Sequence, residues 1–220
     1  MSDSEDEVKS KNLKLVLIGD GSSGKTSIST RYSQDQFERQ YNQTLGIDFF
    51  MKRINLPNHT QVTLSVHDIG GQTLGGPMLD KYLYGADAVL LVYDITNYSS
   101  FENLDDWYQT ALKFCNNPSK NIFYALVANK CDLEHLRAVK HEKHVRYAKE
   151  KSMQSFLVSA KSGESVNTMF LQIAAQILNI PLSRIQVEDE HRVIKAEIVK
   201  FKEVKPPKPP SKKSSICSIQ

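Results

Sequence analysis

The sequence predicts an α/β fold in which a mostly parallel sheet carries helices on both faces, and three observations support this prediction. Strand-like and helix-like segments alternate along the chain, as they do when helices connect parallel strands. Short apolar runs at 88–93 and 121–128 are typical of strands that are buried on both faces. A glycine-rich turn joins the first strand to the first helix, which is a feature of open α/β sheets.

The individual elements follow from the same patterns. The apolar run 13–18 is the first predicted strand, and residues 25–34 form the first predicted helix. Strands at 47–56 and 61–69 are separated by Pro57-Asn58-His59, which signals a hairpin-like turn. Further along, the sequence predicts strands at 88–93, 121–128 and 156–159, and helices at 142–152 and 165–178. Another helix is predicted from Asn97 to about Cys115, with Ser99 and Ser100 as cap candidates.

Length and composition set the domain organisation. The chain has 220 residues, which suggests one domain with tails. We expect a disordered acidic tail at 1–11, a globular domain at 12–180 and a flexible tail at 181–220 with a Pro- and Lys-rich spacer. The net charge of +3 is too small to indicate a nucleic-acid partner. Three cysteines are too few for a disulfide framework, which indicates a reducing compartment such as the cytoplasm.

The turn after the first strand carries the most specific motif. Residues 19–26 read Gly-Asp-Gly-Ser-Ser-Gly-Lys-Thr and fit the pattern G-x-x-x-x-G-K-[ST]. Glycines let backbone N–H groups surround an anion, and the following helix adds its positive end. Lys25 would reach the β- and γ-phosphates of a nucleotide, and the Thr26 hydroxyl would bind Mg²⁺. A chance glycine-serine loop is the alternative, which the strand-loop-helix context disfavours. The predicted phosphate-binding residues are Gly21, Ser22, Ser23, Gly24, Lys25, Thr26 and Ser27.

A second motif, Asp68-x-x-Gly71, lies at the end of a predicted strand. Its carboxylate can hold Mg²⁺ through water, and the Gly71 N–H can face a γ-phosphate, but the same pattern is common in turns. Gln72 follows directly, and a neutral amide beside a γ-phosphate can orient an attacking water. We therefore predict Gln72 as the catalytic residue, with an uninvolved surface glutamine as the alternative.

A third motif, Asn129-Lys-Cys-Asp132, follows a buried strand and predicts the base that is bound. A carboxylate that accepts hydrogen bonds from N1–H and the 2-amino group selects guanine, because adenine would leave it unpaired. A backbone N–H of Ser159-Ala-Lys161, after the last strand, would face the guanine O6. A solvated polar loop is the alternative for the Asn129 motif, and the tripeptide 159–161 supports the prediction only together with the other motifs. An ATP-dependent kinase with the same phosphate loop is disfavoured by the Asn129 motif.

Taken in this order, the motifs resemble those of the Ras superfamily of small GTPases. Three segments, Gly46-Ile-Asp-Phe49, Tyr82-Leu-Tyr-Gly-Ala86 and Leu91-Val-Tyr-Asp-Ile-Thr96, are similar to those of its Rab branch. The resemblance implies a P-loop GTPase fold with a six-stranded, mostly parallel sheet, one antiparallel edge pair and five helices. It also implies a GTP/GDP switch in intracellular membrane trafficking, which uses Mg²⁺ and hydrolyses GTP slowly without an activating protein.

The resemblance assigns roles to single residues. Thr44, in switch I, would join Thr26 as a ligand of Mg²⁺, with Asp68 behind water. Phe37 and the Lys130 stem would pack against the guanine, and Tyr41 would contact the nucleotide. Asn129 and Asp132 would hold the base. The rest of the implied nucleotide-binding set is Gly71, Lys130, Ser159, Ala160 and Lys161.

The segment around Gln72, in switch II, departs from the Rab pattern. Most Rab proteins have Thr-Ala where this chain has Ile69-Gly70, Glu where it has Thr73, and Trp where it has His67. The resemblance implies a monomer whose two switches bind an exchange factor, a GTPase-activating protein and effectors. The unusual segment leaves a second hypothesis open, namely a nucleotide-loaded scaffold whose partner choice hardly depends on hydrolysis.

The C-terminus predicts membrane attachment. Cys217-Ser-Ile-Gln220 fits a C-a-a-X signal whose final Gln points to farnesyl. One prenyl chain gives marginal, reversible binding, and Lys212 and Lys213 add attraction for an anionic leaflet. We expect a protein that exchanges, with a prenyl-binding carrier, between the cytoplasm and the cytoplasmic side of a membrane. An unmodified cysteine is the alternative. The resemblance points to transport vesicles and cilia.

Overall fold

The computed structural model describes residues 10–57, 59–115 and 120–183. The predicted tails lie almost entirely outside these ranges, and so does Cys217, the predicted lipidation site. The first strand begins at Ser10, two residues before the predicted start of the globular domain. In the described part of the chain, no helix combines the length and the apolar character needed to cross a membrane.

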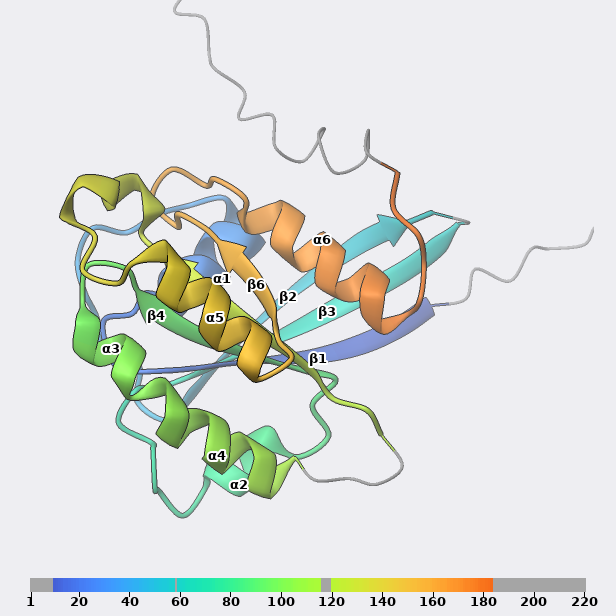
Figure 1. The fold of residues 1–220 in the computed structure, drawn as a ribbon. Helices are drawn as coiled ribbons and strands as arrows, with labels where there is room; N and C mark the ends of the chain where they lie inside the picture. Colours follow the sequence, from blue (N-terminus) through green and yellow to red (C-terminus); the bar gives the residue numbers. More distant parts are fainter. Residues whose placement is uncertain (1–9, 58, 116–119, 184–220) are drawn as a thin grey trace, which may run out of the picture.

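A six-stranded sheet forms the centre of the molecule (Figure 1). Its strand order is β2-β3-β1-β4-β5-β6. Only β2 and β3 pair antiparallel, and the other neighbours pair parallel, which confirms the predicted mostly parallel sheet with an antiparallel edge pair. The strands are β1 (Ser10–Ile18), β2 (Ile47–Leu56), β3 (Thr60–Ile69), β4 (Ala88–Asp94), β5 (Phe123–Asn129) and β6 (Gln154–Leu157).

Helices cover both faces of the sheet, as predicted (Figure 1). One apolar core joins the sheet to α1 and α6, and a second core joins its other face to α2, α3, α4 and α5. The helices are α1 (Lys25–Gln34), α2 (Leu79–Leu83), α3 (Tyr98–Glu102), α4 (Leu104–Phe114), α5 (His141–Glu150) and α6 (Val166–Ile177), with a 3₁₀ helix, η1, at Cys131–Leu136.

The expected number of five helices is wrong for the described residues, which form six α-helices. The helix expected from 97 to 115 is divided between α3 and α4 at Asn103. The Asn103 N–H still bonds the Ser99 carbonyl at 3.0 Å, the i−4 spacing of an α-helix, and it also approaches the Phe101 carbonyl. The cap of this segment is Asn97, whose side chain accepts from the Ser100 N–H, and neither Ser99 nor Ser100 takes that place.

The parallel strands place the predicted motifs at one edge of the sheet. β1, β3, β4, β5 and β6 run in the same direction, so the loops that follow them meet at their carboxyl ends. β1 and β4 form the buried centre, where residues 15–18 and 88–93 have no exposed surface. The last strand ends at Leu157 instead of the expected residue 159, so Ser159 belongs to the following loop.

Candidate nucleotide-binding site

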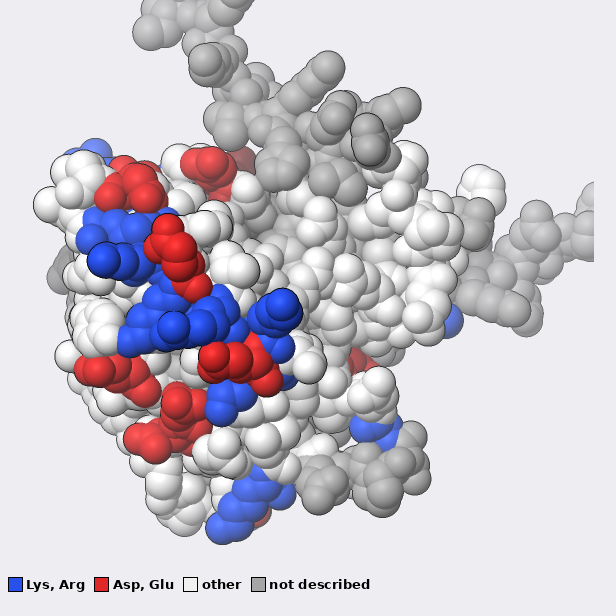
Figure 2. All heavy atoms as spheres, in the orientation of Figure 1, with Lys and Arg blue, Asp and Glu red and all other residues white. Residues whose placement is uncertain are grey.

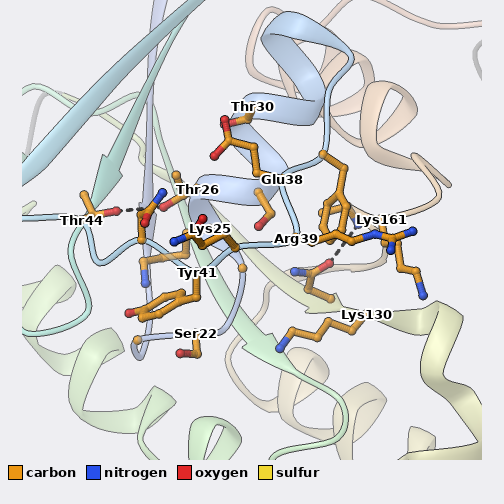
Figure 3. Close-up of a pocket in the computed structure, with 18 of the residues that line it drawn as sticks. Ser22, Lys25, Thr26, Thr30, Glu38, Arg39, Tyr41, Thr44, Lys130 and Lys161 are labelled. Carbon is orange, nitrogen blue, oxygen red and sulfur yellow. Dashed lines mark hydrogen bonds between the residues drawn. The ribbon is translucent and has the colours of Figure 1, made fainter.

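A cavity of about 340 Å³ lies at the carboxyl ends of the strands, and it is lined by almost all of the predicted site residues. Figure 3 shows its two ends: Thr44, Thr26 and Lys25 lie at one end, and Lys130 and Lys161 lie at the other. The predicted residues that line it are Gly21, Ser22, Gly24, Lys25, Thr26, Ser27, Phe37, Tyr41, Thr44, Gly71, Asn129, Lys130, Asp132, Ala160 and Lys161.

The phosphate loop leads from β1 into α1 in a conformation that requires glycine. Gly24 forms the N-cap of α1 with a φ of 91°, in the left-handed region. A Cβ at Gly24 would lie 2.2 Å from Asn129 Nδ2, and a Cβ at Gly71 would lie 2.1 Å from the Gly21 nitrogen. Backbone therefore packs against backbone at this end of the cavity, and the N-terminus of α1 points its N–H groups at the space that remains.

Lys25 gives this end of the cavity a buried positive charge. Its Nζ donates to the carbonyl oxygens of Gly19 and Asp20 at 2.8 and 2.9 Å. Burial lowers the pKa of the Lys25 ammonium to about 8, although the negative charges of Asp68 and Asp20 act to raise it. Among the described residues, no carboxylate forms an ion pair with Lys25, so the ammonium is free to bind an anionic ligand.

Thr26, Thr44 and Asp68 form a cluster of oxygen atoms beside Lys25. The two threonine Oγ1 atoms lie 2.9 Å apart, and both donate to Asp68 Oδ2, at 2.5 and 3.3 Å. Burial raises the pKa of the Asp68 carboxyl, and its other oxygen, Oδ1, is buried without a hydrogen-bond partner. A nearby cation or its bound water would satisfy this oxygen.

These residues fit Mg²⁺, although the described chain contains no group of three or more His, Cys, Asp and Glu side chains that could hold a metal alone. Mg²⁺ is usually bound by one or two protein groups together with phosphates and waters. In an octahedral shell with bonds of 2.0–2.1 Å, neighbouring oxygens lie about 2.9 Å apart. The spacing of the two threonine hydroxyls matches that value.

Gln72 lies outside the cavity lining but next to the phosphate loop. A Cβ at Gly21 would lie 3.1 Å from Gln72 Nε2 and 3.5 Å from the Tyr41 hydroxyl. Gln72 is exposed to solvent, and Tyr41 is 58% exposed. The Gln72 amide can therefore reach both water and the end of the cavity that Lys25 and Thr26 line, which is the placement expected for orienting a water molecule.

At the opposite end, Asn129 and Asp132 are held by short contacts. The buried Asn129 side chain donates to the Ser23 carbonyl at 2.9 Å and accepts from the Ala160 N–H at 3.2 Å, so it joins the phosphate loop to the loop after β6. Asp132 accepts from Ser159 Oγ at 2.7 Å, and its second oxygen lies 3.6 Å from Lys161 Nζ. The Ala160 N–H, a predicted donor to the guanine O6, is thus already shared with Asn129.

Lys130 and Phe37 both line this cavity. Lys130 has a φ of 67°, and its ammonium pairs with Asp94 Oδ2 at 2.6 Å, so the aliphatic stem lines the cavity. Phe37 lines the cavity and also packs against the core beneath α1 and α6. Two apolar surfaces that face a cavity are the arrangement that a flat aromatic ring occupies.

Four predicted residues do not line the cavity: Ser23, Asp68, Gln72 and Ser159. Ser23 and Ser159 contact lining residues directly, because the Ser23 carbonyl holds Asn129 and the Ser159 hydroxyl holds Asp132. The prediction missed residues that line the cavity mainly from the segment before Thr44. Most of them lie between Phe37 and Thr44, and that position beside two predicted residues was the only signal for them in the sequence. The missed residues are Thr30, Glu38, Arg39, Gln40, Asn42 and Leu133.

The surface charge on one face of the molecule, away from the cavity lining, is mixed. In Figure 2, basic and acidic side chains interleave on the face that carries α3, α4 and α5. Lys143, Arg146, Glu102, Asp105 and Glu150 line a shallow pocket there. A surface of mixed sign lacks the extended basic stripe of a nucleic-acid-binding face.

Comparisons with known proteins agree with this geometry. Residues 14–179 match the sequence profile of the Ras family. The chain is 43% identical to "Ras-related protein Rab-28" of Caenorhabditis elegans, with 90% of this chain and 80% of the relative covered. It is 36% identical to "Ras-related protein Rab-13" of Canis lupus familiaris, with 75% and 79% covered. The phosphate loop, the oxygen cluster and the cavity end that Asn129, Lys130 and Asp132 line thus occur in a chain that belongs to the Ras family, as a small GTPase of the Rab type.

Proposed function

We propose that this GTPase, which switches between GTP and GDP states in membrane trafficking, senses the γ-phosphate through Thr44 and hydrolyses GTP with the help of Gln72. One observation carries the proposal: the hydroxyls of Thr26 and Thr44 meet at the Asp68 carboxylate, next to Lys25. This cluster connects switch I (residues 35–46) to the phosphate loop at the place where the γ-phosphate of GTP would lie.

Each side chain has a distinct part in the reaction. The phosphate loop and Lys25 bind the β- and γ-phosphates and stabilise the charge that develops on them. Gln72 orients a water for attack on the γ-phosphorus, in line with the leaving GDP. Thr26 and Thr44 would hold Mg²⁺ with Asp68 behind water, and the ion would neutralise phosphate charge. Loss of the γ-phosphate removes the contacts that hold Thr44 and Gly71, and the two switches relax.

At the base end, we propose that Asp132 and the loop 159–161 select guanine. The Ser159 hydroxyl fixes one Asp132 oxygen, which leaves the carboxylate able to face the two adjacent donors on guanine. A competition assay between GDP and ADP tests this, and equal affinities would contradict it.

Single-turnover hydrolysis tests the role of Gln72. Gln72→Leu keeps the approximate size of the side chain but cannot hydrogen-bond water, so we expect the rate to fall about tenfold or more, roughly 1.4 kcal/mol or more of transition-state stabilisation. GTP affinity should be retained. The control is Gln109→Leu, an exposed position on α4. An unchanged rate would assign the catalytic part elsewhere.

The same assay addresses the second candidate, a scaffold that hardly uses hydrolysis. The unusual segment 69–73 motivates it, but one contact between the two switches, supported by a second within switch II, favours the switch. The Gly70 N–H donates to the Gly46 carbonyl at 2.9 Å, and Thr73 Oγ1 donates to the Gly70 carbonyl at 2.7 Å. Switch II is therefore bonded to switch I. A pulldown in which GTP-locked and GDP-locked forms retain the same partners would support the scaffold instead.

We further propose that a prenyl chain on Cys217, farnesyl by the final Gln, attaches the protein to the cytoplasmic side of membranes. A prenyl-binding carrier would extract it. After cell fractionation, the share of the Cys217→Ser protein found with membranes should fall to that of a purely cytosolic protein. The control Ser215→Ala, two residues away, should be found with membranes as often as the unaltered protein. Recovery that survives Cys217→Ser would refute attachment by this cysteine.

The compartment that we propose is the cilium together with transport vesicles. The support is the resemblance to Rab-28, at 43% identity over 90% of this chain. Imaging of the tagged protein in ciliated cells, with Cys217→Ser as the control, tests this placement, and a signal confined to other membranes would contradict it.

A further inference from the structure

Arg31 joins two walls of the nucleotide site from behind. It lies in the last turn of α1, and its side chain is 17% exposed. Its Nε donates to the Ala160 carbonyl at 3.0 Å and its Nη2 to the Lys161 carbonyl at 2.9 Å. The third nitrogen, Nη1, donates to the carbonyl of Asp35 at 2.9 Å. One planar guanidinium thus binds three backbone carbonyls from two segments that are far apart in the sequence.

The first of these segments is the loop that lies at the base end of the cavity. Ala160 and Lys161 line the cavity, and the Ala160 N–H is bonded to Asn129 on the other side. The Arg31 stem packs against the same loop, because a Cβ at Gly163 would lie 3.6 Å from Arg31 Cδ. The loop is therefore held between Asn129 in front and Arg31 behind.

The second segment is the start of switch I. Asp35 caps the C-terminus of α1 with a φ of 54°, and Phe37, two residues later, lines the cavity. Arg31 also forms an ion pair with Asp35 Oδ1 at 3.2 Å, but that carboxylate is 91% exposed and contributes little. The bonds to the backbone carbonyls, which cannot turn away independently of the chain, carry the connection.

We propose that Arg31 is a positioning residue that holds the guanine end of the site closed and thereby slows nucleotide release. The inference rests on the proposed function, in which the loop 159–161 and Phe37 flank guanine. For the base to leave, the loop and the start of switch I must separate, and Arg31 resists that motion because its bonds reach both. A lysine can replace it only in part, because a single ammonium lacks the planar fork that reaches all three carbonyls.

The test is the release rate of fluorescent GDP from the full-length, magnesium-loaded protein. Arg31→Ala should release GDP about tenfold faster, equivalent to roughly 1.4 kcal/mol, and Arg31→Lys should recover only part of the difference. The matched control is Arg146→Ala on α5. Arg146 pairs with Glu150 at the same i,i+4 spacing, at 3.7 Å, and is 69% exposed, so its release rate should be unchanged.

A second measurement separates positioning from general loosening of α1, which also carries Lys25 and Thr26. If Arg31 positions the loop 159–161, Arg31→Ala should weaken GDP binding but not ADP binding, so the preference for GDP over ADP should fall. Two results would overturn the proposal: an equal loss of affinity for GDP and ADP in Arg31→Ala, or a GDP release rate of Arg31→Ala that matches that of Arg146→Ala. If Arg31→Ala does not fold, Arg31→Lys gives the same comparison.

Asp132→Ala distinguishes failure of this inference from failure of the proposed function. If Asp132→Ala releases GDP faster and the Arg31 variants do not, only the role of Arg31 is wrong. If Asp132→Ala leaves both the release rate and the preference for GDP unchanged, the proposed base site itself is wrong.

Discussion

At the scale of single residues, the missing side chain at position 70 decides how closely the two switches approach. The Gly70 N–H bonds the Gly46 carbonyl, and a Cβ at Gly70 would lie 2.4 Å from the Thr44 carbonyl oxygen. Real Cβ atoms do not come that close to a backbone oxygen. An alanine here, as most Rab proteins have, would therefore require the Thr44 backbone to move outward from its place in this structure.

We predict that Gly70→Ala weakens the GTP state selectively. The added methyl group pushes the Thr44 carbonyl outward and carries its hydroxyl away from Thr26 and Asp68. Affinity for a non-hydrolysable GTP analogue should fall about tenfold, roughly 1.4 kcal/mol. GDP affinity should be retained, because the contact of Thr44 serves the triphosphate state. Calorimetry with both nucleotides measures this, and equal losses would contradict it.

At the scale of elements, α4 is bonded directly to the phosphate loop. The Asp20 carboxylate accepts from Asn103 Nδ2 at 2.6 Å and from Trp107 Nε1 at 3.0 Å. Trp107 is itself 1% exposed, so the second bond comes from a side chain fixed in the core. The break between α3 and α4 lies at Asn103, which places its amide at the start of α4, beside Asp20.

We predict that Asn103→Ala speeds GDP release about fivefold, because a charge-assisted hydrogen bond typically contributes roughly 1.5–3 kcal/mol and exposure reduces that value. The phosphate loop would then be tied to α4 by Trp107 alone. Stopped-flow release of labelled GDP gives the rate, and Gln109→Ala on the same helix is the control. A lower melting temperature with unchanged release would mean that this bond only stabilises the fold.

At the scale of the whole molecule, a buried histidine makes folding stability depend on pH. His144 is 1% exposed, and its Nδ1 lies 3.0 Å from the Tyr93 hydroxyl. Burial, together with smaller contributions from the charges of His141 and Arg137, lowers the pKa of His144 from 6.5 to about 4. Between these values the unfolded chain binds a proton on this imidazole that the folded chain does not bind. The contribution is therefore complete above pH 6.5 and is lost as the pH falls toward 4.

We predict that this effect removes about 2 kcal/mol of unfolding free energy between pH 7 and pH 5. His144→Gln keeps a group that can bond Tyr93 but does not titrate, so its stability should depend less on pH over that interval. Urea denaturation of both proteins at the two pH values gives the comparison. Parallel pH profiles would show that another group is responsible.

The sequence predicted the architecture well because its signals are local. The phosphate loop, the Asp68 motif and the Asn129 motif each follow an apolar run, and the parallel sheet places their loops at one edge. The break at Asn103 and the five-residue α2 were not predicted, since neither is long enough to show a period. The roles of Arg31, Asp20 and Asp94 depend on side chains that meet only in the folded chain, so no pattern in the sequence indicates them.

The position of β2 has a consequence for the protein in concentrated solution. β2 has ten residues and forms one border of the sheet, whereas β6, at the other border, has four. Within the described residues no strand pairs with the outer side of β2, and Phe49 and Met51 are 66% and 67% exposed on it. Such a border can recruit a strand from another molecule and seed aggregation. The charges of Asp48 and Arg53 on the same strand are what oppose that association during storage.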